Sequence, residues 1–238
     1  MTKKLLNIVV FSGAGMSAES GIPTFRDSNG LWENYSIHEV ATPQAWKHDP
    51  DLVTKFYNQR RKNILESIPN EAHLEISRFE SINPITVITQ NIDDLHERSG
   101  STRVLHLHGN IMQSKSSGPD TEKAYYDINS WELKSTDKCP DGYRLRPHVV
   151  WFGEEVYELS NAAKIIKEAD ILIVIGTSLQ VYPASGLIHE TNPDCKRYII
   201  DPKCEEMIVP SDFVKVNSSA SAGIKTVLEN IKKVLTKG

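Results

Sequence analysis

The chain has 238 residues, of which 39% are hydrophobic, and this is enough for one sizeable core with at most a small second one. Its formal net charge of −4 excludes the basic surface of a nucleic-acid-binding protein. Three cysteines without a C-x-x-C pair, no secretory signal and no long apolar segment predict a cytoplasmic protein without membrane association, which we expect to be monomeric.

Apolar, strand-like segments alternate with helical patterns along the chain. The predicted strands are residues 5–11, 85–89, 104–107, 171–175 and 198–200, and the predicted helices are residues 51–68, 71–81, 94–99, 159–168 and 221–236. The strands show little alternation of polar and apolar residues, which is typical of a parallel sheet that helices cover on both faces. The predicted fold class is therefore α/β, with ligands bound beyond the carboxyl ends of the strands.

The first predicted strand ends in Gly13–Ala18, which fits the G-x-G-x-x-G/A form of a dinucleotide-binding turn and favours a Rossmann-like sheet. We expect Gly13 to take backbone angles forbidden to other residues, Gly15 to admit a pyrophosphate, and Ala18 to let the next helix pack closely. The N-terminus of that helix would offer N–H groups to phosphates. A tight turn without any ligand is the alternative.

The segment after this turn departs from a simple dinucleotide fold. Gly21–Pro23 ends the helix early, and residues 24–32 form a predicted loop that carries an aromatic residue, an arginine and an aspartate. Such a loop beside the phosphates suggests a lid over a cofactor. A dehydrogenase would instead continue into a strand that ends in Asp or Glu about twenty residues on, so this class is disfavoured.

The motif Gly13-Ala14-Gly15-x-Ser17-x-x-Ser20-Gly21-Ile22-Pro23-x-Phe25-Arg26 resembles the opening motif of the sirtuins, the NAD-dependent protein-lysine deacylases. The resemblance implies NAD as the cofactor and acylated lysine side chains of proteins as the partners. The cofactor contacts that it implies in this region are Gly13, Ala14, Gly15, Ser17, Ala18, Glu19, Thr24, Phe25, Arg26 and Trp32.

A polar segment, Thr-Gln-Asn-Ile-Asp at residues 89–93, follows the second predicted strand. On spacing alone, one of its polar residues could simply cap the next helix. The segment resembles the sirtuin T-Q-N-I-D segment, which implies that Gln90 and Asn91 contact the nicotinamide ribose and that Ile92 and Asp93 hold the carboxamide. A carboxylate beside a backbone N–H suits a carboxamide, which has both donors and an acceptor.

Two histidines, His106 and His108, lie at the end of the third predicted strand. Alternation along a strand puts both on one face, so geometry alone does not choose between them, and a histidine at a strand end is more often structural than catalytic. His108 precedes Gly109 and matches the sirtuin H-G motif, which implies that it is the general base, with Asn91 as the second catalytic residue. An unperturbed pKa of about 6.5 suits this role. We expect His106 to serve packing.

Two further segments resemble sirtuin motifs. Gly176, Thr177 and Ser178 follow the strand at residues 171–175 and by resemblance bind the adenosine half of NAD, although a helix cap is the alternative. Ala220 matches an adenine contact loosely. Residues 146–154 resemble the R-P-x-V-V-W-F-G-E motif, whose main chain pairs with an extended substrate peptide. The implied residues for acyl-lysine are Val150, Trp151, Phe152 and Gly153.

Tyr57 and Arg60 lie three residues apart on a predicted helix and therefore share a face. A guanidinium group with a neighbouring phenol suits a carboxylate, whereas a solvated helix face is the alternative. The pair resembles the Y-x-x-R of class III sirtuins, which contacts the distal carboxylate of succinyl-, malonyl- or glutaryl-lysine.

Most sirtuins bind a structural zinc through two C-x-x-C pairs between the H-G and R-P-x-V-V-W-F-G-E motifs. Because this interval contains only Cys139, we predict no metal site. A smaller inserted domain is predicted at residues 27–83 and 110–147, beside an NAD-binding domain at residues 1–26, 84–109 and 148–238. The apolar residues expected to hold residues 110–147 together are Ile111, Tyr125, Tyr126, Ile128, Trp131, Leu133 and Leu145.

Together the motifs imply a bacterial-type class III sirtuin. The implied reaction removes acetyl and succinyl or malonyl groups from lysine and yields nicotinamide and O-acyl-ADP-ribose, with His108 as the base. A mono-ADP-ribosyltransferase on the same fold is the alternative. A non-catalytic NAD-binding module is disfavoured because both His108 and Asn91 are present.

Overall fold

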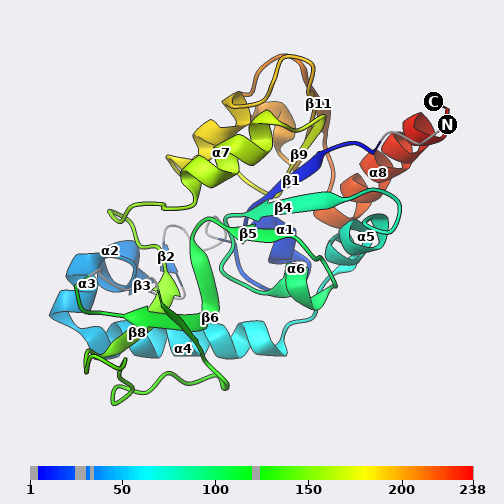
Figure 1. Ribbon diagram of the computed structural model, residues 1–238. Helices are drawn as coiled ribbons and strands as arrows, with labels where there is room; N and C mark the ends of the chain where they lie inside the picture. The colour runs from blue at the N-terminus through cyan, green and yellow to red at the C-terminus, as the bar shows by residue number, and fades with distance from the viewer. Residues whose placement is uncertain (1–4, 25–30, 33–34, 120–123, 238) are drawn as a thin grey trace.

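The computed structural model describes residues 5–24, 31–32, 35–119 and 124–237. Its centre is a six-stranded parallel sheet with the strand order β11-β10-β9-β1-β4-β5 (Figure 1). The strands, in that order, are Phe213–Val216, Lys196–Ile200, Ile171–Ile175, Ile8–Ser12, Ile85–Thr89 and Val104–His106. All residues of β1 and β9 are buried, as expected for central strands with helices on both faces.

Helices cover both faces of this sheet and so confirm the predicted α/β class. On one face α5 (Glu71–Phe79) and α8 (Ala220–Lys237) bury a core that includes residues of β1, β4 and β9. On the other face lie α7 (Leu159–Lys167) and the 3₁₀-helix η1 (Ala184–His189). A second short 3₁₀-helix, η2, spans Cys204–Glu206 before β11.

Turn and cap residues explain where several of these elements begin. The Asn70 carboxamide oxygen accepts a hydrogen bond from the backbone N–H of Ala72 at 2.9 Å and so caps α5. The Asp49 carboxylate accepts from the Leu52 N–H at 2.9 Å and caps α4 (Pro50–Glu66), whose first residue is a proline. The predicted starts of these helices lie within one residue of the observed ones because cap chemistry is local.

A smaller body lies beside the central sheet, below it in the view of Figure 1. It contains a three-stranded antiparallel sheet with the order β7-β6-β8, and α4 packs on β6 and β8. The strands of this sheet are β6 (Gly109–Ser116), β7 (Tyr125–Asp127) and β8 (Leu145–Val149). The remaining elements are α1 (Gly15–Ala18), β2 (Leu31–Trp32), β3 (Tyr35–Ser36), α2 (Ile37–Val40), α3 (Pro43–His48) and α6 (Leu95–Arg98).

The apolar residues predicted to hold residues 110–147 together divide into three groups. Leu133 and Leu145 form a small core with Cys139, and Tyr126 and Ile128 pack against it. Ile111 belongs to a different core, under α4. The prediction is wrong for the remaining two, because Tyr125 and Trp131 are 48% and 45% exposed.

Helix α5 packs with α8 on the core of the central sheet, although the division predicted from the sequence assigns residues 71–83 to the smaller domain. Its apolar face is Ala72, Ile76 and Phe79. Sequence periodicity shows that such a face exists, but not which body it packs against, because the partner helix α8 begins about 140 residues later along the chain.

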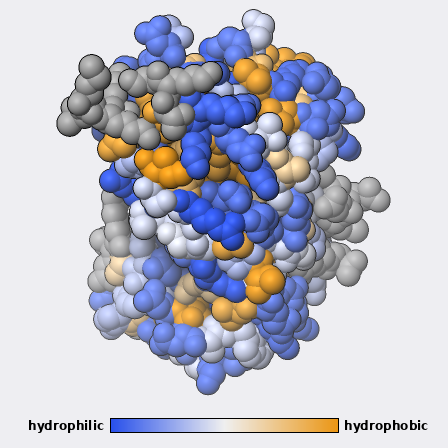
Figure 2. Space-filling model, turned by 90° about the vertical axis from the view of Figure 1, so that its right-hand side faces the viewer, coloured by the Kyte–Doolittle hydropathy of each residue, from blue (hydrophilic) through white to orange (hydrophobic). Residues whose placement is uncertain are grey.

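The surface is mixed in character. On the face shown in Figure 2, hydrophobic residues lie in small groups between hydrophilic ones. Within the part of the chain that the structure describes, no helix is both long and apolar enough to cross a membrane. Among the same residues, no three His, Cys, Asp or Glu side chains are grouped as a metal site would require.

Candidate active site

The turns after β1 and β9 are in close contact at the carboxyl end of the sheet. The Gly15 N–H donates to the Gly176 carbonyl at 2.7 Å. A Cβ atom on Gly13 would lie 2.7 Å from the Thr177 Cβ, and one on Gly15 would lie 2.8 Å from the Gly176 Cα. Glycine is therefore needed at both positions because another main chain passes too close for a side chain.

The structure corrects two predictions about the turn. Gly13 does not have a positive φ; the left-handed glycine here is Gly176, with φ of +60°. Ala18 is exposed and does not allow close helix packing, since the residues of α1 that are buried are Met16 and Ser17. The sequence motif correctly indicates a tight turn, but it does not show which main chain the turn would meet.

Replacing Gly13 by Ala is expected to lower the free energy of unfolding by about 2 kcal/mol, because the added Cβ must displace Thr177 or the Gly176 carbonyl. Urea denaturation of both proteins measures this loss. Gly186→Ala is a matched control, since a Cβ there approaches only the Tyr182 side chain, at 3.6 Å. Equal stability of the Gly13 and Gly186 variants would contradict the proposed contact.

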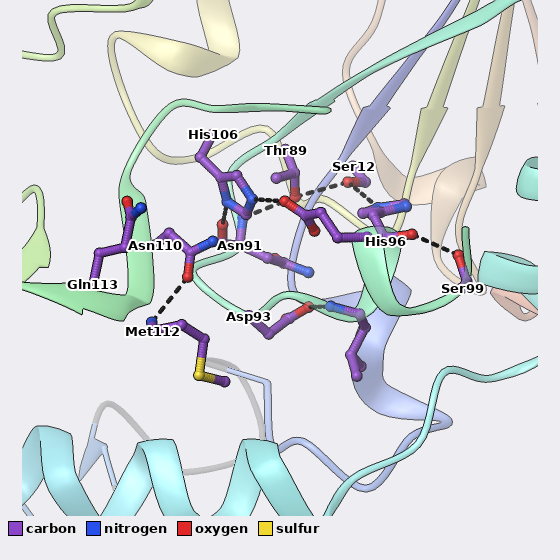
Figure 3. A network of polar contacts seen from close by, with 12 residues as sticks. Ser12, Thr89, Asn91, Asp93, His96, Ser99, His106, Asn110, Met112 and Gln113 are labelled. Atoms are coloured by element: carbon purple, nitrogen blue, oxygen red, sulfur yellow. Dashed lines mark hydrogen bonds and ion pairs between the residues drawn. The ribbon is translucent and has the colours of Figure 1, made fainter. Parts of the chain in front are cut away.

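A buried polar cluster lies next to these turns. The Asn91 Nδ2 donates to Ser17 Oγ at 3.1 Å, and this hydroxyl donates to Asp93 Oδ2 at 2.9 Å. All three side chains are buried, and Asn91 and Asp93 are drawn in Figure 3. Burial raises the pKa of Asp93, although the hydrogen bonds from the Leu95 N–H and from Ser17 lower it in part. The cluster brings together three residues that the sequence assigns to NAD.

The residues expected on the ribose and the adenosine also meet here. Gln90 Nε2 donates to Thr177 Oγ1 at 3.0 Å and so joins the ends of β4 and β9. Ser178 is half-buried beside Thr177, and Ile92 is buried in the core under α4. These polar groups therefore line the carboxyl end of the sheet, where the topology of an α/β fold places a ligand.

One ring nitrogen of His108 forms a hydrogen bond with the main chain of the segment that carries Asn91 and Asp93. Its Nδ1 lies 2.9 Å from the Gln90 carbonyl oxygen. A carbonyl can only accept, so Nδ1 carries the proton and Nε2 keeps its lone pair. Burial lowers the pKa of His108, and the hydrogen bond to Gln90 offsets this only in part. The ring is therefore neutral near neutral pH, with a basic nitrogen, as a general base requires.

His106 is not a packing residue, contrary to the expectation from the sequence. Its Nδ1 lies 3.0 Å from the Asn91 carbonyl oxygen, and its Nε2 lies 2.7 Å from Glu97 Oε1. The two histidines predicted on one strand face thus bind adjacent carbonyl groups, those of Gln90 and Asn91.

The remaining predicted cofactor residues have varied surroundings. The Glu19 carboxylate accepts a hydrogen bond from the Ser221 N–H at 3.0 Å, at the start of α8, where Ala220 is buried. Ala14 is exposed and Thr24 is half-buried. Phe25 and Arg26 lie outside the described residues, as does the side chain of Trp32. The roles of all these residues toward NAD stay predictions.

The predicted substrate residues of α4 and of the segment after β8 are in contact. Trp151 Nε1 donates to the Tyr57 hydroxyl at 3.1 Å, and Tyr57 is completely buried. Burial raises the pKa of this phenol far above its ordinary value, although the positive charge of Arg60 opposes the shift. Arg60 is 5% exposed. The pair is therefore not on a solvated helix face, which removes that alternative.

The segment that follows β8 is attached to the chain at His108. The Val150 N–H donates to the His108 carbonyl at 2.9 Å. Two residues later, Phe152 is 46% exposed, and Gly153 has a φ of +92° with open space where a Cβ would lie. Main chain near His108 is thus exposed in part, as recognition of a peptide by its backbone requires.

A model of the Sir2 family matches residues 13–183 of the chain. The chain belongs to the Sir2 family. Proteins named NAD-dependent protein deacylase in Helicobacter pylori strain J99 and in Bacteroides thetaiotaomicron are each 45% identical to it. The alignments cover 94% and 96% of this chain, and 95% and 97% of those proteins.

Solved structures of Sir2 homologues agree with this assignment. A complex of a Sir2 homologue with NAD has a TM-score of 0.82 at 36% identity and covers 96% of this chain and 90% of its own. A complex described as Sir2 with a p53 peptide and NAD⁺ has a TM-score of 0.72 at 29% identity, with 94% and 93% coverage. The sequence resemblance to the sirtuins is confirmed.

Several polar residues of this Sir2 protein were missed by sequence reasoning. Ser12 Oγ donates to Thr89 Oγ1 at 2.9 Å and lies 3.0 Å from His96 Nε2 (Figure 3). The His96 ring contacts the ring of His73, with centroids 4.8 Å apart. Burial lowers the pKa of His73 to about 4 and also lowers that of His96. Four separate chain segments supply this network, so no local pattern could reveal it.

Arg146 and Glu154 were also missed, although both are part of the matched R-P-x-V-V-W-F-G-E motif. The Arg146 guanidinium lies 3.6 Å from the centroid of the Trp151 ring and 2.8 Å from Glu154 Oε2. Glu154 Oε2 also accepts from the Trp151 N–H at 2.9 Å. This ion pair fixes the tryptophan that binds Tyr57, and the charged ends of the motif are the signal that could have indicated it.

Proposed function

We propose that the chain is an NAD-dependent protein deacylase that removes acyl groups from lysine side chains. The observation that carries this proposal is the neutral His108 ring, whose basic Nε2 is set by the hydrogen bond from Nδ1 to the Gln90 carbonyl. Membership of the Sir2 family and relatives named NAD-dependent protein deacylase support it.

The polar groups at the site fit NAD chemically. Asn91 and Ser17 provide an amide and a hydroxyl group that would hold ribose oxygens, and Thr177 provides a hydroxyl for the adenosine side. The buried Asp93 carboxylate would accept from the carboxamide of nicotinamide. When bound, NAD supplies a ribose carbon that becomes electrophilic as nicotinamide leaves.

The residues of the chain itself perform three tasks in this reaction. His108 accepts a proton at Nε2, while the bond from Nδ1 to Gln90 keeps its tautomer unchanged. Asn91 and Asp93 are held in place by Ser17, so little reorganisation is needed when substrate binds. Val150 links the substrate-binding segment to the His108 carbonyl and so brings acyl-lysine to the base.

The wild-type protein with NAD and an acetyl-lysine or succinyl-lysine peptide tests this function. We expect one nicotinamide and one O-acyl-ADP-ribose for each lysine released, as measured by mass spectrometry. A mono-ADP-ribosyltransferase would instead leave ADP-ribose on protein and the acyl group on lysine. This second outcome would replace the proposed function.

Within this function, we propose that Arg60 selects acyl groups that end in a carboxylate. It is buried on α4, three residues after Tyr57, and a guanidinium group pairs with a carboxylate through two hydrogen bonds. Arg60→Met is expected to lower kcat/KM for succinyl-lysine by about 10- to 100-fold and to spare acetyl-lysine.

The matched control for this substitution is Gln59→Ala, because Gln59 is exposed on the neighbouring position of α4 and bonds only within that helix, to Asn63. Kinetics on both peptides distinguish the effects. Equal losses on acetyl- and succinyl-lysine would show that Arg60 supports the fold of the site and does not contact the acyl group.

A further inference from the structure

The loop at residues 89–92, which would contact nicotinamide and its ribose, forms hydrogen bonds with one short segment through each of its backbone carbonyl groups. Four consecutive carbonyl groups, those of residues 89–92, each accept a hydrogen bond from residues 106–111, at 2.9 to 3.0 Å. The donors, in that order, are Leu107 N, His108 Nδ1, His106 Nδ1 and Ile111 N. Two of the four donors are therefore imidazole rings, and the two rings differ in what their other nitrogen contacts.

His106 binds an acceptor at both ring nitrogens. Nδ1 contacts the Asn91 carbonyl at 3.0 Å and Nε2 contacts the Glu97 carboxylate at 2.7 Å (Figure 3). Neither a carbonyl nor an ionised carboxylate can donate, and a neutral imidazole has only one N–H. Both bonds can exist together only if the ring is an imidazolium. His108, by contrast, needs a proton at Nδ1 alone.

We propose that His106 is a positioning residue that acts as an imidazolium. Glu97 holds its charge, and the ring fixes the backbone carbonyl of Asn91 and thereby the side-chain amide of the same residue. This amide donates to Ser17 and is the group that would meet the ribose. The proposal rests on the proposed deacylase function. It assigns opposite protonation states to two histidines on one strand end, a charged ring that positions and a neutral ring that takes the proton.

The charges around His106 favour this state. Burial lowers its pKa, but the hydrogen bond and charge of Glu97, the hydrogen bond to the Asn91 carbonyl and the charge of Asp93 together outweigh burial, so the pKa is raised. Two other histidines, His96 and His148, have a pKa that burial lowers and that the positive charge of His106 lowers further, so both rings stay neutral. The side chains of His106 and Glu97 are 12% and 39% exposed, so solvent screens the pair in part.

The sign of the pH dependence follows from these directions. The charged form of His106 contributes fully below the ordinary pKa of histidine. This contribution is lost as the pH rises through the raised pKa of His106, because the ring then loses a proton. At the acid side, burial raises the pKa of Glu97, but its hydrogen bond and ion pair with His106, a backbone hydrogen bond and the charge of His73 together outweigh burial. The pKa is therefore lowered, and the carboxylate persists to lower pH than usual. Deacylation should therefore decline at alkaline pH as His106 loses its proton.

Nuclear magnetic resonance of the unliganded protein with ¹⁵N-labelled histidine tests the protonation states of His106 and His108 without an enzymatic assay. At a pH just above the ordinary histidine pKa of about 6.5, His106 should show two protonated nitrogens and His108 one. In Glu97→Gln the titration midpoint of His106 should fall, because the ring loses the carboxylate that holds its charge. A neutral His106 at that pH in the wild type would overturn the proposal.

Kinetics separate positioning from a merely structural role. His106→Gln keeps an N–H donor for the Asn91 carbonyl but cannot titrate, so it should retain kcat within about threefold and lose the alkaline decline. His106→Leu has no donor and should lower kcat by about tenfold or more at every pH. Equal kcat values in the Gln and Leu variants, or an unchanged pH profile in Glu97→Gln, would refute positioning by a charged ring.

A matched control is Glu71→Gln, which removes a carboxylate from the exposed ion pair of Glu71 with Arg78 on α5 and should leave the profile unchanged. The experiment also distinguishes two kinds of failure. If the wild type releases no lysine from any acyl peptide, the proposed function is wrong, while the resonances still decide the state of His106. If the wild type is active and the Glu97 variant keeps its profile, only the positioning role is wrong.

Discussion

Replacing His108 by Ala is expected to lower kcat for deacylation by about 10²- to 10⁴-fold, the usual contribution of a general base. The ring is half-buried between β5 and β6, and its Nδ1 bond to Gln90 leaves Nε2 as the basic nitrogen. The neighbouring His106 differs, since it contacts acceptors at both ring nitrogens.

The measurement is steady-state kinetics on an acetyl-lysine peptide, together with the affinity for NAD by calorimetry. NAD should still bind, because Gln90, Asn91 and Thr177 stay in place. His189→Ala is the control, since His189 is exposed on η1. Full activity of His108→Ala would exclude this ring as the base, and loss of NAD binding together with activity would indicate a structural effect.

Replacing Asn58 by Ala is expected to lower the free energy of unfolding by about 3 kcal/mol. The Asn58 side chain forms two hydrogen bonds to the backbone of Leu133, one as donor and one as acceptor, both at 2.9 Å. It also accepts from Arg61 Nη1 at 2.7 Å. The Ala variant would leave three buried groups without this partner, and each costs about 1 kcal/mol or more.

The stability of this connection depends on Arg61 as well. Its guanidinium group is completely buried and donates to the carbonyl oxygens of Ile111 and Trp131, at 2.6 and 3.0 Å. Burial lowers its pKa to about 10, so it stays charged at neutral pH. Asn58 and Arg61 thus bind α4 to Ile111, Trp131 and Leu133. These residues lie in the interval between the H-G and R-P-x-V-V-W-F-G-E motifs, in which Cys139 is the single cysteine.

Urea denaturation measures this loss, with Asn63→Ala as the control, because Asn63 lies on the same helix and its side chain bonds only to Gln59. The control should lose less than about 0.5 kcal/mol. An equally small loss in Asn58→Ala would show that water replaces its contacts to Leu133, and that the apolar core under α4, which includes Ile111 and Val149, holds this segment to the helix.

The central strands of the sheet could be predicted from the sequence, whereas several edge and antiparallel strands could not. The bounds of β4 and β9 match the prediction at both ends, because strands covered on both faces are continuous apolar runs in any sequence. The edge strand β11 was missed, since it has only four residues and includes Lys215. The antiparallel strand β6 was missed because a polar, half-exposed strand resembles a loop in sequence. β8 is mostly buried, but Arg146, Pro147 and His148 at its centre break the apolar run that would predict a strand.

By itself the sequence determined the parallel sheet and the tight glycine turn, because apolar runs and glycine spacing are local properties. The resemblance to the sirtuins, and not spacing alone, predicted the roles of Asn91, Asp93 and His108. Only the tertiary structure decided which nitrogen of each histidine carries a proton, since that depends on carbonyl and carboxylate groups brought from other segments. It likewise decided that Gly13 is needed for close approach to Thr177, about 160 residues away along the chain. Contacts between distant segments determine the protonation of the histidines and the space around Gly13, and no local sequence pattern encodes such contacts.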